Sequence, residues 1–118
     1  MSIFDLNIEP MLIKKESEPF DNPDWIYELK LDGIRAVVYT DGTELQIKNK
    51  RMLRLDPIFP ELQHIPKQVH KPCILDGELF VSVDGKPDFS KIQARALMSN
   101  YMKIELAARK FPAGFAAY

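Results

Sequence analysis

The chain has 118 residues, enough for one modest domain or for one lobe of a larger domain. Apolar residues make up 46% of the sequence and charged residues 28%, and these proportions exclude an intrinsically disordered chain. With 16 basic and 17 acidic side chains the formal net charge is −1. The chain as a whole therefore does not attract a polyanion, and any contact with nucleic acid requires a local basic patch.

Cysteine content and hydropathy narrow the class further. The single cysteine, Cys73, excludes an internal disulfide and a cysteine-based zinc site, and its place at the start of an apolar stretch predicts a buried thiol. No apolar run approaches the roughly 18 residues that a membrane span needs. Residues 1–5 do not have the pattern of a secretory signal. We therefore expect a protein of a reducing cytosol without a membrane partner.

The first half of the chain predicts strands after an irregular start. Residues 1–24 carry three prolines among mixed charges, which favours an extended N-terminal lead-in. Alternation of apolar and polar residues predicts a half-buried strand over 25–31. Two further strands, over 35–40 and 44–48, are joined by the turn dipeptide Asp41-Gly42, which predicts an antiparallel hairpin.

The second half mixes helices and strands. Asp56 is expected to cap a short helix over 56–63 that has Pro57 at its first position. Asp88 is expected to cap a helix over 89–98 in which Phe89, Ile92, Ala96 and Leu97 share one face. The remaining expected elements are strand segments over 73–76 and 78–83, a turn at Asp84-Gly85, a weaker helix over 103–109 and a strand that begins at 115–118.

These elements together predict the α+β class, with antiparallel strands and one or two flanking helices. The last predicted strand reaches Tyr118 without a turn or capping signal. A strand cut at that point leaves unpaired backbone groups, so we expect the sequence to be the front portion of a longer domain.

Glycines that follow aspartates mark two positions of chemical interest. Gly42 and Gly85 lie between the polar ends of strands and predict ordinary turns. Around Gly33, strand alternation puts Lys30 and Asp32 on one face, roughly 7 Å apart. Directly after Gly77, the Glu78 carboxylate lies in an apolar run, where a charge requires a partner. The residues by themselves support an anion or metal site and no more than that.

The segment Lys30-Leu31-Asp32-Gly33-Ile34-Arg35 resembles the Lys-x-Asp-Gly nucleophile motif of the covalent nucleotidyltransferases. Its surroundings resemble ATP-dependent DNA ligases, and the lead-in around Pro19-Phe20 and Trp25 is similar to the bacterial end-joining type. The other matching segments follow in the family's order over nearly the whole chain: Asn49-Lys50-Arg51, Phe59-Pro60-Glu61-Leu62, Asp76-Gly77-Glu78-Leu79, the helix from Phe89 to Arg95, and Phe115-Ala116-Ala117-Tyr118. The resemblance implies that residues 25–118 are the N-terminal portion of an ATP-grasp-like ligase adenylation domain.

The resemblance also implies a covalent mechanism that uses ATP and Mg²⁺. The amine of Lys30 attacks the α-phosphorus of ATP, expels pyrophosphate and holds AMP as a phosphoramidate. AMP then passes to a 5′-phosphate at a break in DNA, and the 3′-hydroxyl seals the break. A lysine attacks only when it is neutral. Because Glu28 and Asp32 stabilise the charged form, a divalent cation and further cationic groups must act at the site.

Matching positions suggest a role for each expected site residue. Glu28 is expected near the adenine, and Arg35 is expected to reach the ribose and the nick phosphate with its fork-shaped guanidinium. Glu78 is expected to bind the ribose or a metal ion, and Tyr118 to stack on the purine. Two neighbours are expected to be structural: Phe115 belongs to the core, and Asp32 orders its turn.

A basic stretch predicts contact with phosphates. Lys48, Lys50, Arg51 and Arg54 fall within seven residues, and a ligase needs phosphate contacts near its nucleophile. Lys50 stands where the family usually has an arginine, and Asn49 where it has a serine. Either Lys50 or Arg51 therefore makes the family's arginine contact to ATP and DNA. His64 and His70 lack a paired ligand spacing and are expected at the surface.

The family's later motifs are not in the sequence, so we expect the 118 residues alone to be a poor enzyme or inactive. The expected partners are ATP, nicked or broken DNA, and end-joining or repair proteins. One alternative is an RNA ligase or a capping-type transferase, which sealing of RNA or labelling from GTP would favour. The other is a non-catalytic fragment that binds a nucleotide or a partner without turnover.

Overall fold

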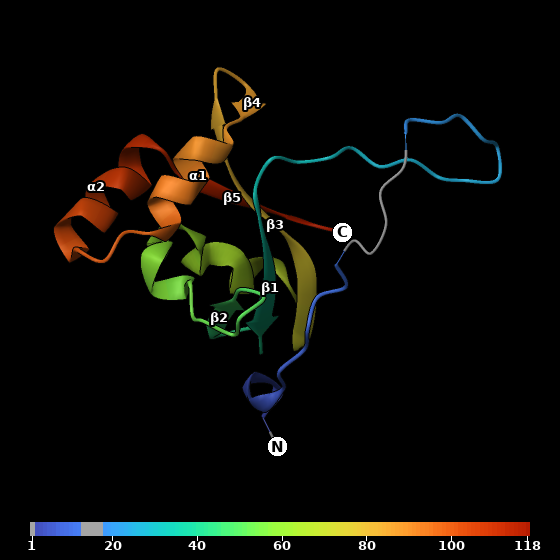
Figure 1. The fold of residues 1–118 in the computed structure, drawn as a ribbon. Helices are drawn as coiled ribbons and strands as arrows, with labels where there is room; N and C mark the ends of the chain where they lie inside the picture. Colours follow the sequence, from blue (N-terminus) through green and yellow to red (C-terminus); the bar gives the residue numbers. More distant parts are fainter. Residues whose placement is uncertain (1, 13–17) are drawn as a thin grey trace.

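One long strand organises the sheet in this computed structural model, which describes residues 2–12 and 18–118. Strand β3 pairs with β1, β4 and β5, with β1 and β5 on opposite edges, and every pairing is antiparallel (Figure 1). The strand order is β2-β1-β3-β4, with β5 also beside β3. The strands are β1 (Ile34–Thr40), β2 (Leu45–Lys48), β3 (Cys73–Val83), β4 (Lys86–Pro87) and β5 (Ala113–Ala117).

In the described parts of the chain, two α-helices and three 3-10 segments flank this sheet. They are α1 (Phe89–Ala96), α2 (Tyr101–Lys110), η1 (Ile3–Asp5), η2 (Asp56–Ile58) and η3 (Pro60–Gln68). Figure 1 shows α1, α2 and η3 grouped on one side of the strands. The predicted α+β class with an antiparallel sheet is therefore confirmed. Within the described parts of the chain, no helix has the length and hydropathy needed to span a bilayer.

Strand alternation gives the sheet two different faces. Ala36 and Val38 of β1 belong to the hydrophobic core, together with residues of η3 and α1. The alternate residues Val37 and Tyr39 face the other way, where the N-terminal segment 2–12 covers them. There the Tyr39 hydroxyl accepts a hydrogen bond from the backbone N–H of Ile8 at 3.0 Å. One face of the sheet is thus a core, and the other receives the N-terminal lead-in.

Both predicted turns and the hairpin are confirmed. The Asp41 carboxylate accepts backbone hydrogen bonds from Thr43 and Glu44 and so orders the loop between β1 and β2. Asp84 and Gly85 both have positive φ in the two-residue turn between β3 and β4.

Strand β3 runs without a break through Asp76-Gly77, where the sequence indicated two separate segments. Gly77 permits this, because a Cβ atom there would lie 2.2 Å from the backbone oxygen of Ala116 in β5. At the start of the strand, Cys73 is half-buried rather than buried.

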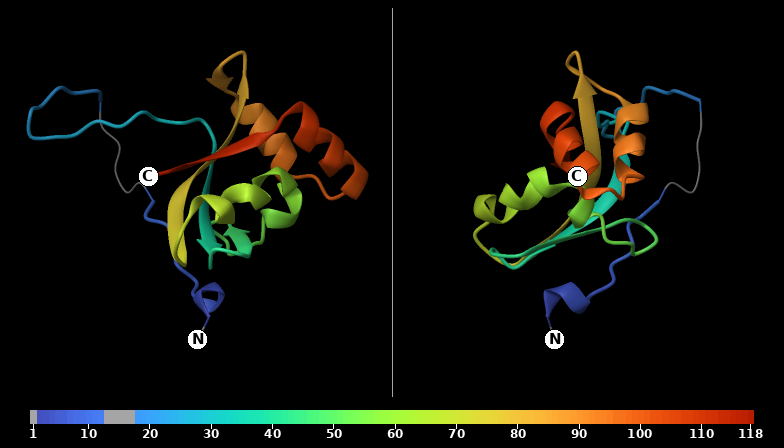
Figure 2. Two further views of the ribbon diagram at one scale, coloured as in Figure 1. Left: turned by 180° about the vertical axis from the view of Figure 1, so that it is seen from behind. Right: turned by 90° about the vertical axis from the view of Figure 1, so that its left-hand side faces the viewer.

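The expected strand over 25–31 is wrong. These residues form no strand, and Ile26 and Leu29 are 90% and 84% exposed. A strand needs a hydrogen-bonded neighbour. The adjacent strand β1 cannot be that neighbour, because its two edges are already paired with β2 and with β3. Figures 1 and 2 show the chain between 18 and 30 leaving the sheet as an extended loop. The rest of the predicted lead-in is irregular apart from η1, and residues 1 and 13–17 of it lie outside the described residues.

The predicted helix over 56–63 is replaced by two 3-10 segments, η2 and η3, and Asp56 does not cap them. The carboxylate of Asp56 instead accepts from the Ile47 backbone N–H at 3.1 Å and pairs with Arg54 at 2.6 Å. It therefore ties η2 to β2. The predictions of α1 with its Asp88 cap, of α2 and of β5 are confirmed, but their bounds differ. Helix α1 ends at Ala96, α2 begins at Tyr101 after an Asn100 cap that was not predicted, and β5 begins at Ala113 and ends before Tyr118.

The buried face of α1 differs from the expected one. Ile92 is fully buried, but Phe89 and Leu97 are exposed, and Arg95 lies inside with only 2% of its surface exposed. The Arg95 guanidinium pairs with the Glu61 carboxylate and donates to the backbone oxygens of Ile58 and Phe111. Because Glu61 also accepts from the Ala113 N–H, the pair connects η3, α1 and β5.

This buried pair predicts a stability effect. Glu61→Ala leaves the Arg95 charge unpaired in the interior, and we expect it to lower the free energy of unfolding by about 3 kcal/mol. Urea denaturation followed by circular dichroism measures the change, with the exposed neighbour variant Gln63→Ala as the control. Equal denaturation midpoints for the two variants would contradict this account.

Candidate functional site

An open cavity of about 380 Å³ brings together residues that are far apart in the sequence. It lies between the 28–31 segment, the first residues of β1, the middle of β3 and the residue that follows β5. Five of the six residues expected to bind ATP line this cavity: Glu28, Lys30, Arg35, Glu78 and Tyr118. Leu12, Leu29 and Leu31 complete the lining, and Leu12 was not predicted. A volume of this size lies in the range of ordinary small-ligand sites.

Gly33 lets the segment that carries Lys30 lie against the sheet. A Cβ atom at residue 33 would lie 2.1 Å from the backbone oxygen of Leu79 and 2.8 Å from Cγ of Glu78. Any larger residue would therefore push the segment away from β3. Lys30 itself is exposed, and its charge is close enough to stabilise the ionised form of Glu78.

Arg35 and Glu78 are directly opposite each other on β1 and β3, on the face of the sheet away from the core. The Arg35 guanidinium forms two bonds to Asp76, Nε to Oδ1 at 2.7 Å and Nη2 to Oδ2 at 2.6 Å. This pair raises the pKa of Arg35 further above its ordinary value, mainly through the hydrogen bond to Asp76. The Arg35 guanidinium was expected to donate two hydrogen bonds to the ribose and the nick phosphate, but two of its nitrogens already donate to Asp76. Sequence reasoning missed this contact, which becomes visible only in the strand register.

Tyr118 connects the groups of the cavity. Its hydroxyl donates to Oε1 of Glu78 at 3.2 Å, and its ring lies under the Arg35 guanidinium, 4.7 Å from Cζ to the ring centroid. Burial, followed by the nearby Glu78 charge, raises the pKa of the Tyr118 hydroxyl. Burial also raises the pKa of Glu78, although Tyr118 and Arg35 act in the opposite direction.

The predicted basic stretch does not form one face. The Nζ of Lys48 is directed inward and donates to the Phe4 backbone oxygen at 3.2 Å and to Asn7 Oδ1 at 3.3 Å. Arg54 is paired with Asp56. Lys50 and Arg51 are exposed and have no side-chain partner among the described residues. They lie in a turn that the Asn49 side chain closes by accepting hydrogen bonds from the N–H groups of Arg51 and Leu53. Lys50 does not line the cavity.

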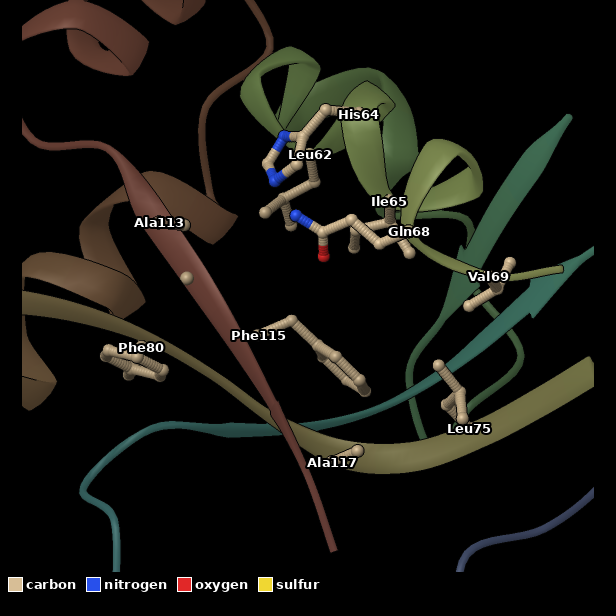
Figure 3. A pocket seen from close by; sticks show the side chains of 11 residues that line it. Leu62, His64, Ile65, Gln68, Val69, Leu75, Phe80, Ala113, Phe115 and Ala117 are labelled. Atoms are coloured by element: carbon tan, nitrogen blue, oxygen red, sulfur yellow. The ribbon is translucent and has the colours of Figure 1, made fainter. Parts of the chain in front are cut away.

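Other predicted residues are plainly structural. Phe115 packs against the core, as expected, and His64 and His70 are exposed. No hydrogen bond among the described residues uses the Asp32 side chain, so its predicted role in ordering the turn has no observed contact. Figure 3 shows a second cavity, of about 470 Å³, between η3 and β5. Apart from His64 and Gln68 its lining is apolar, which does not suit a triphosphate.

The raised pKa of Glu78 gives a pH-dependent prediction. Ionised Glu78 is disfavoured in the folded chain, so it lowers stability at pH values above its folded pKa and has no such effect below the ordinary value of 4.5. Glu78→Gln is therefore expected to be more stable than the parent at pH 7, with a difference that closes at pH 3.5.

Urea denaturation at both pH values measures this difference. The exposed variant Glu44→Gln is the control and should show no comparable gain at pH 7. A Glu78→Gln chain that is equally destabilised at both pH values would rule out the burial effect.

Several known proteins resemble this chain over most of its length. Residues 10–118 match the family described as ATP dependent DNA ligase domain. DNA ligase C of Mycobacterium tuberculosis is 30% identical over 112 residues, which cover 94% of this chain and 30% of the relative. The bifunctional non-homologous end joining protein LigD of Bacillus subtilis is 29% identical over 111 residues, which cover 86% of this chain and 18% of that protein. The chain spans about a third of the length of the mycobacterial DNA ligases that it resembles.

A solved structure has the same fold. The structure described as mycobacterial DNA ligase D complexed with ATP and MES superimposes with a TM-score of 0.61 at 24% sequence identity, covering 77% of this chain and 27% of that chain. At this identity the likeness speaks for the fold alone, while the family match extends over nearly the whole sequence. The chain thus belongs to the ATP-dependent DNA ligase domain family.

Proposed function

We propose that Lys30 accepts AMP from ATP and that the adenylate is then passed to a 5′-phosphate at a DNA break. The observation that carries this proposal is the single cavity in which Lys30 lies with Glu28, Arg35, Glu78 and Tyr118. These residues come from the 28–31 segment, β1, β3 and the residue after β5, so their convergence is a property of the fold. The family match supports ATP as the nucleotide.

Each step of the proposed reaction is a substitution at phosphorus. The Lys30 amine loses a proton and forms an N–P bond to the α-phosphorus, and the bond to pyrophosphate breaks. An oxygen of the DNA 5′-phosphate then displaces lysine from AMP. In the last step the 3′-hydroxyl attacks that phosphate, and AMP leaves with the bonding electrons.

The other residues would hold the nucleoside. Tyr118 is suited to stack on the purine, and the Glu78 carboxylate can accept from a ribose hydroxyl. To do so the Tyr118 ring must offer a face to the base, while Arg35 occupies the other face at 4.7 Å. Glu28 is exposed at the cavity wall and is proposed to lie near the adenine.

The donor set fits a magnesium ion that arrives with the nucleotide. No group of three or more His, Cys, Asp or Glu side chains could hold a metal ion in the described ranges 2–12 and 18–118. Mg²⁺ is usually bound by one or two carboxylates together with substrate phosphates and water, and Glu78 can supply one such carboxylate. When bound there, the ion would neutralise charge on the phosphates and favour attack at phosphorus.

The charge balance of the cavity explains why the chain alone should react slowly. Lys30 and Arg35 supply two positive charges, and Glu28 and Glu78 supply two negative charges. The described lining therefore provides no net field to attract a triphosphate or to make the lysine neutral. Further cationic groups would be needed for rapid adenylylation.

For DNA, we propose that Lys50 and Arg51 contact backbone phosphates, since both are exposed and unpaired among the described residues. A guanidinium can grip a phosphate with two donors, whereas a lysine acts as a point charge. Broken or nicked duplex in the bacterial cytosol is the proposed substrate. The name of the LigD relative also motivates the proposal that the protein associates with end-joining or repair proteins.

The proposal predicts selective chemical labelling of Lys30. An adenosine with a sulfonyl fluoride at its 5′ position reacts with amines close to a bound nucleoside. We expect Lys30 to react faster than the exposed Lys103 of α2, and AMP to protect Lys30 only. Peptide mapping by mass spectrometry measures both rates. Equal rates at the two lysines, with no protection by AMP, would reject the nucleotide site.

A parallel incubation with radiolabelled ATP and Mg²⁺ tests the covalent step. We expect slow labelling that Lys30→Arg abolishes. Robust labelling of Lys30 would overturn the expected inactivity of the isolated chain, and label that survives Lys30→Arg would exclude Lys30 as the nucleophile.

A further inference from the structure

Asp76 is the only residue in the described ranges that contacts both cavity residues Arg35 and Tyr118 through hydrogen bonds. Its carboxylate accepts hydrogen bonds from Nε and Nη2 of Arg35 at 2.7 and 2.6 Å. Its backbone oxygen accepts from the Tyr118 N–H at 2.8 Å. The contact to Arg35 is diagonal in the sheet, because the residue directly opposite Asp76 on β1 is Val37.

This arrangement fixes the guanidinium in three dimensions. Two parallel bonds to one carboxylate set the plane of the Arg35 group, since such bidentate pairs are directional. The Tyr118 ring below it, at 4.7 Å, limits movement out of that plane. Of the two terminal nitrogens, Nη2 is used by Asp76, and Nη1 makes no hydrogen bond among the described residues.

We propose that Asp76 is a positioning residue that holds Arg35 so that Nη1 donates to a ribose or phosphate oxygen of the bound nucleotide. This inference rests on the proposed nucleotide site. It assigns to Arg35 one donor group toward the ligand, Nη1, whereas the sequence suggested a bidentate contact by the guanidinium. Preorganisation of this kind improves binding because the long arginine side chain no longer has to be ordered when the ligand arrives.

A purely stabilising role explains the pair less well. The side chains of Arg35 and Asp76 are 23% and 39% exposed. Ion pairs as exposed as this contribute little to stability. The pair lies instead in the wall of the cavity, beside the Glu78 carboxylate and the Tyr118 ring.

Calorimetric titration of the 118-residue chain with AMP tests the inference. We expect Asp76→Asn to weaken AMP binding about five- to tenfold, which corresponds to the ordering of one long side chain. Arg35→Gln should weaken it at least as much. The double variant should be no weaker than Arg35→Gln, because Asp76 acts through Arg35. Asp84→Asn, a matched change in the β3–β4 turn, should have no effect.

Two further readouts separate positioning from folding. The Arg35 Nε–H resonance in ¹H–¹⁵N spectra should be protected from exchange in the parent and in Asp84→Asn, lost in Asp76→Asn and partly recovered in Asp76→Glu. AMP affinity should recover in parallel.

The possible failures are distinguishable. AMP binding that Arg35→Gln weakens and Asp76→Asn does not would overturn the role of Asp76 and leave the nucleotide site standing. Equal and additive losses would also overturn it. Absence of AMP binding to the parent chain would remove the proposed function and this role together.

Discussion

The candidate site depends on the absence of a side chain at residue 33. The backbone of Gly33 lies so close to β3 that a Cβ atom would meet the Leu79 carbonyl oxygen at 2.1 Å. This contact lets the segment that carries Glu28 and Lys30 reach the sheet without belonging to it. Because the segment has no strand partner, its position relative to β3 relies on this close approach. The position of the segment that carries Lys30 is therefore fixed by packing of backbone on backbone.

The period of a β-strand explains how a small sheet can serve two purposes. In β3, Leu79 and Val81 belong to the core, while Asp76 and Glu78 line or support the cavity. In β1, Ala36 and Val38 face the helices and Arg35 faces the opposite side. A shift of one residue in the register would bury the charges and expose the core. Packing of the apolar residues therefore also sets the geometry of Arg35, Asp76 and Glu78.

Local signals in the sequence were sufficient for the hairpin turns, for the Asp88 cap of α1 and for most cavity residues. These signals were insufficient where contacts with distant parts of the chain decide whether a segment forms a strand or a side chain is buried. Alternation over 25–31 satisfied a strand pattern, but no neighbouring edge was free to accept it. Arg95 occupies a helix position that looks exposed, and it is buried because Glu61 and two carbonyl groups satisfy it. The Arg35–Asp76 pair depends on strand register, which one sequence does not reveal.

The most direct measurement is a titration of the ¹⁵N-labelled chain with AMP, followed through backbone amide shifts. We expect the largest changes on residues 28–35, 76–78 and 118. Gly33→Ala should abolish them, whereas Gly42→Ala should not. Changes concentrated around His64, Gln68 and Phe115, in the apolar cavity, would contradict this expectation. So would a response in Gly33→Ala equal to that of the parent chain.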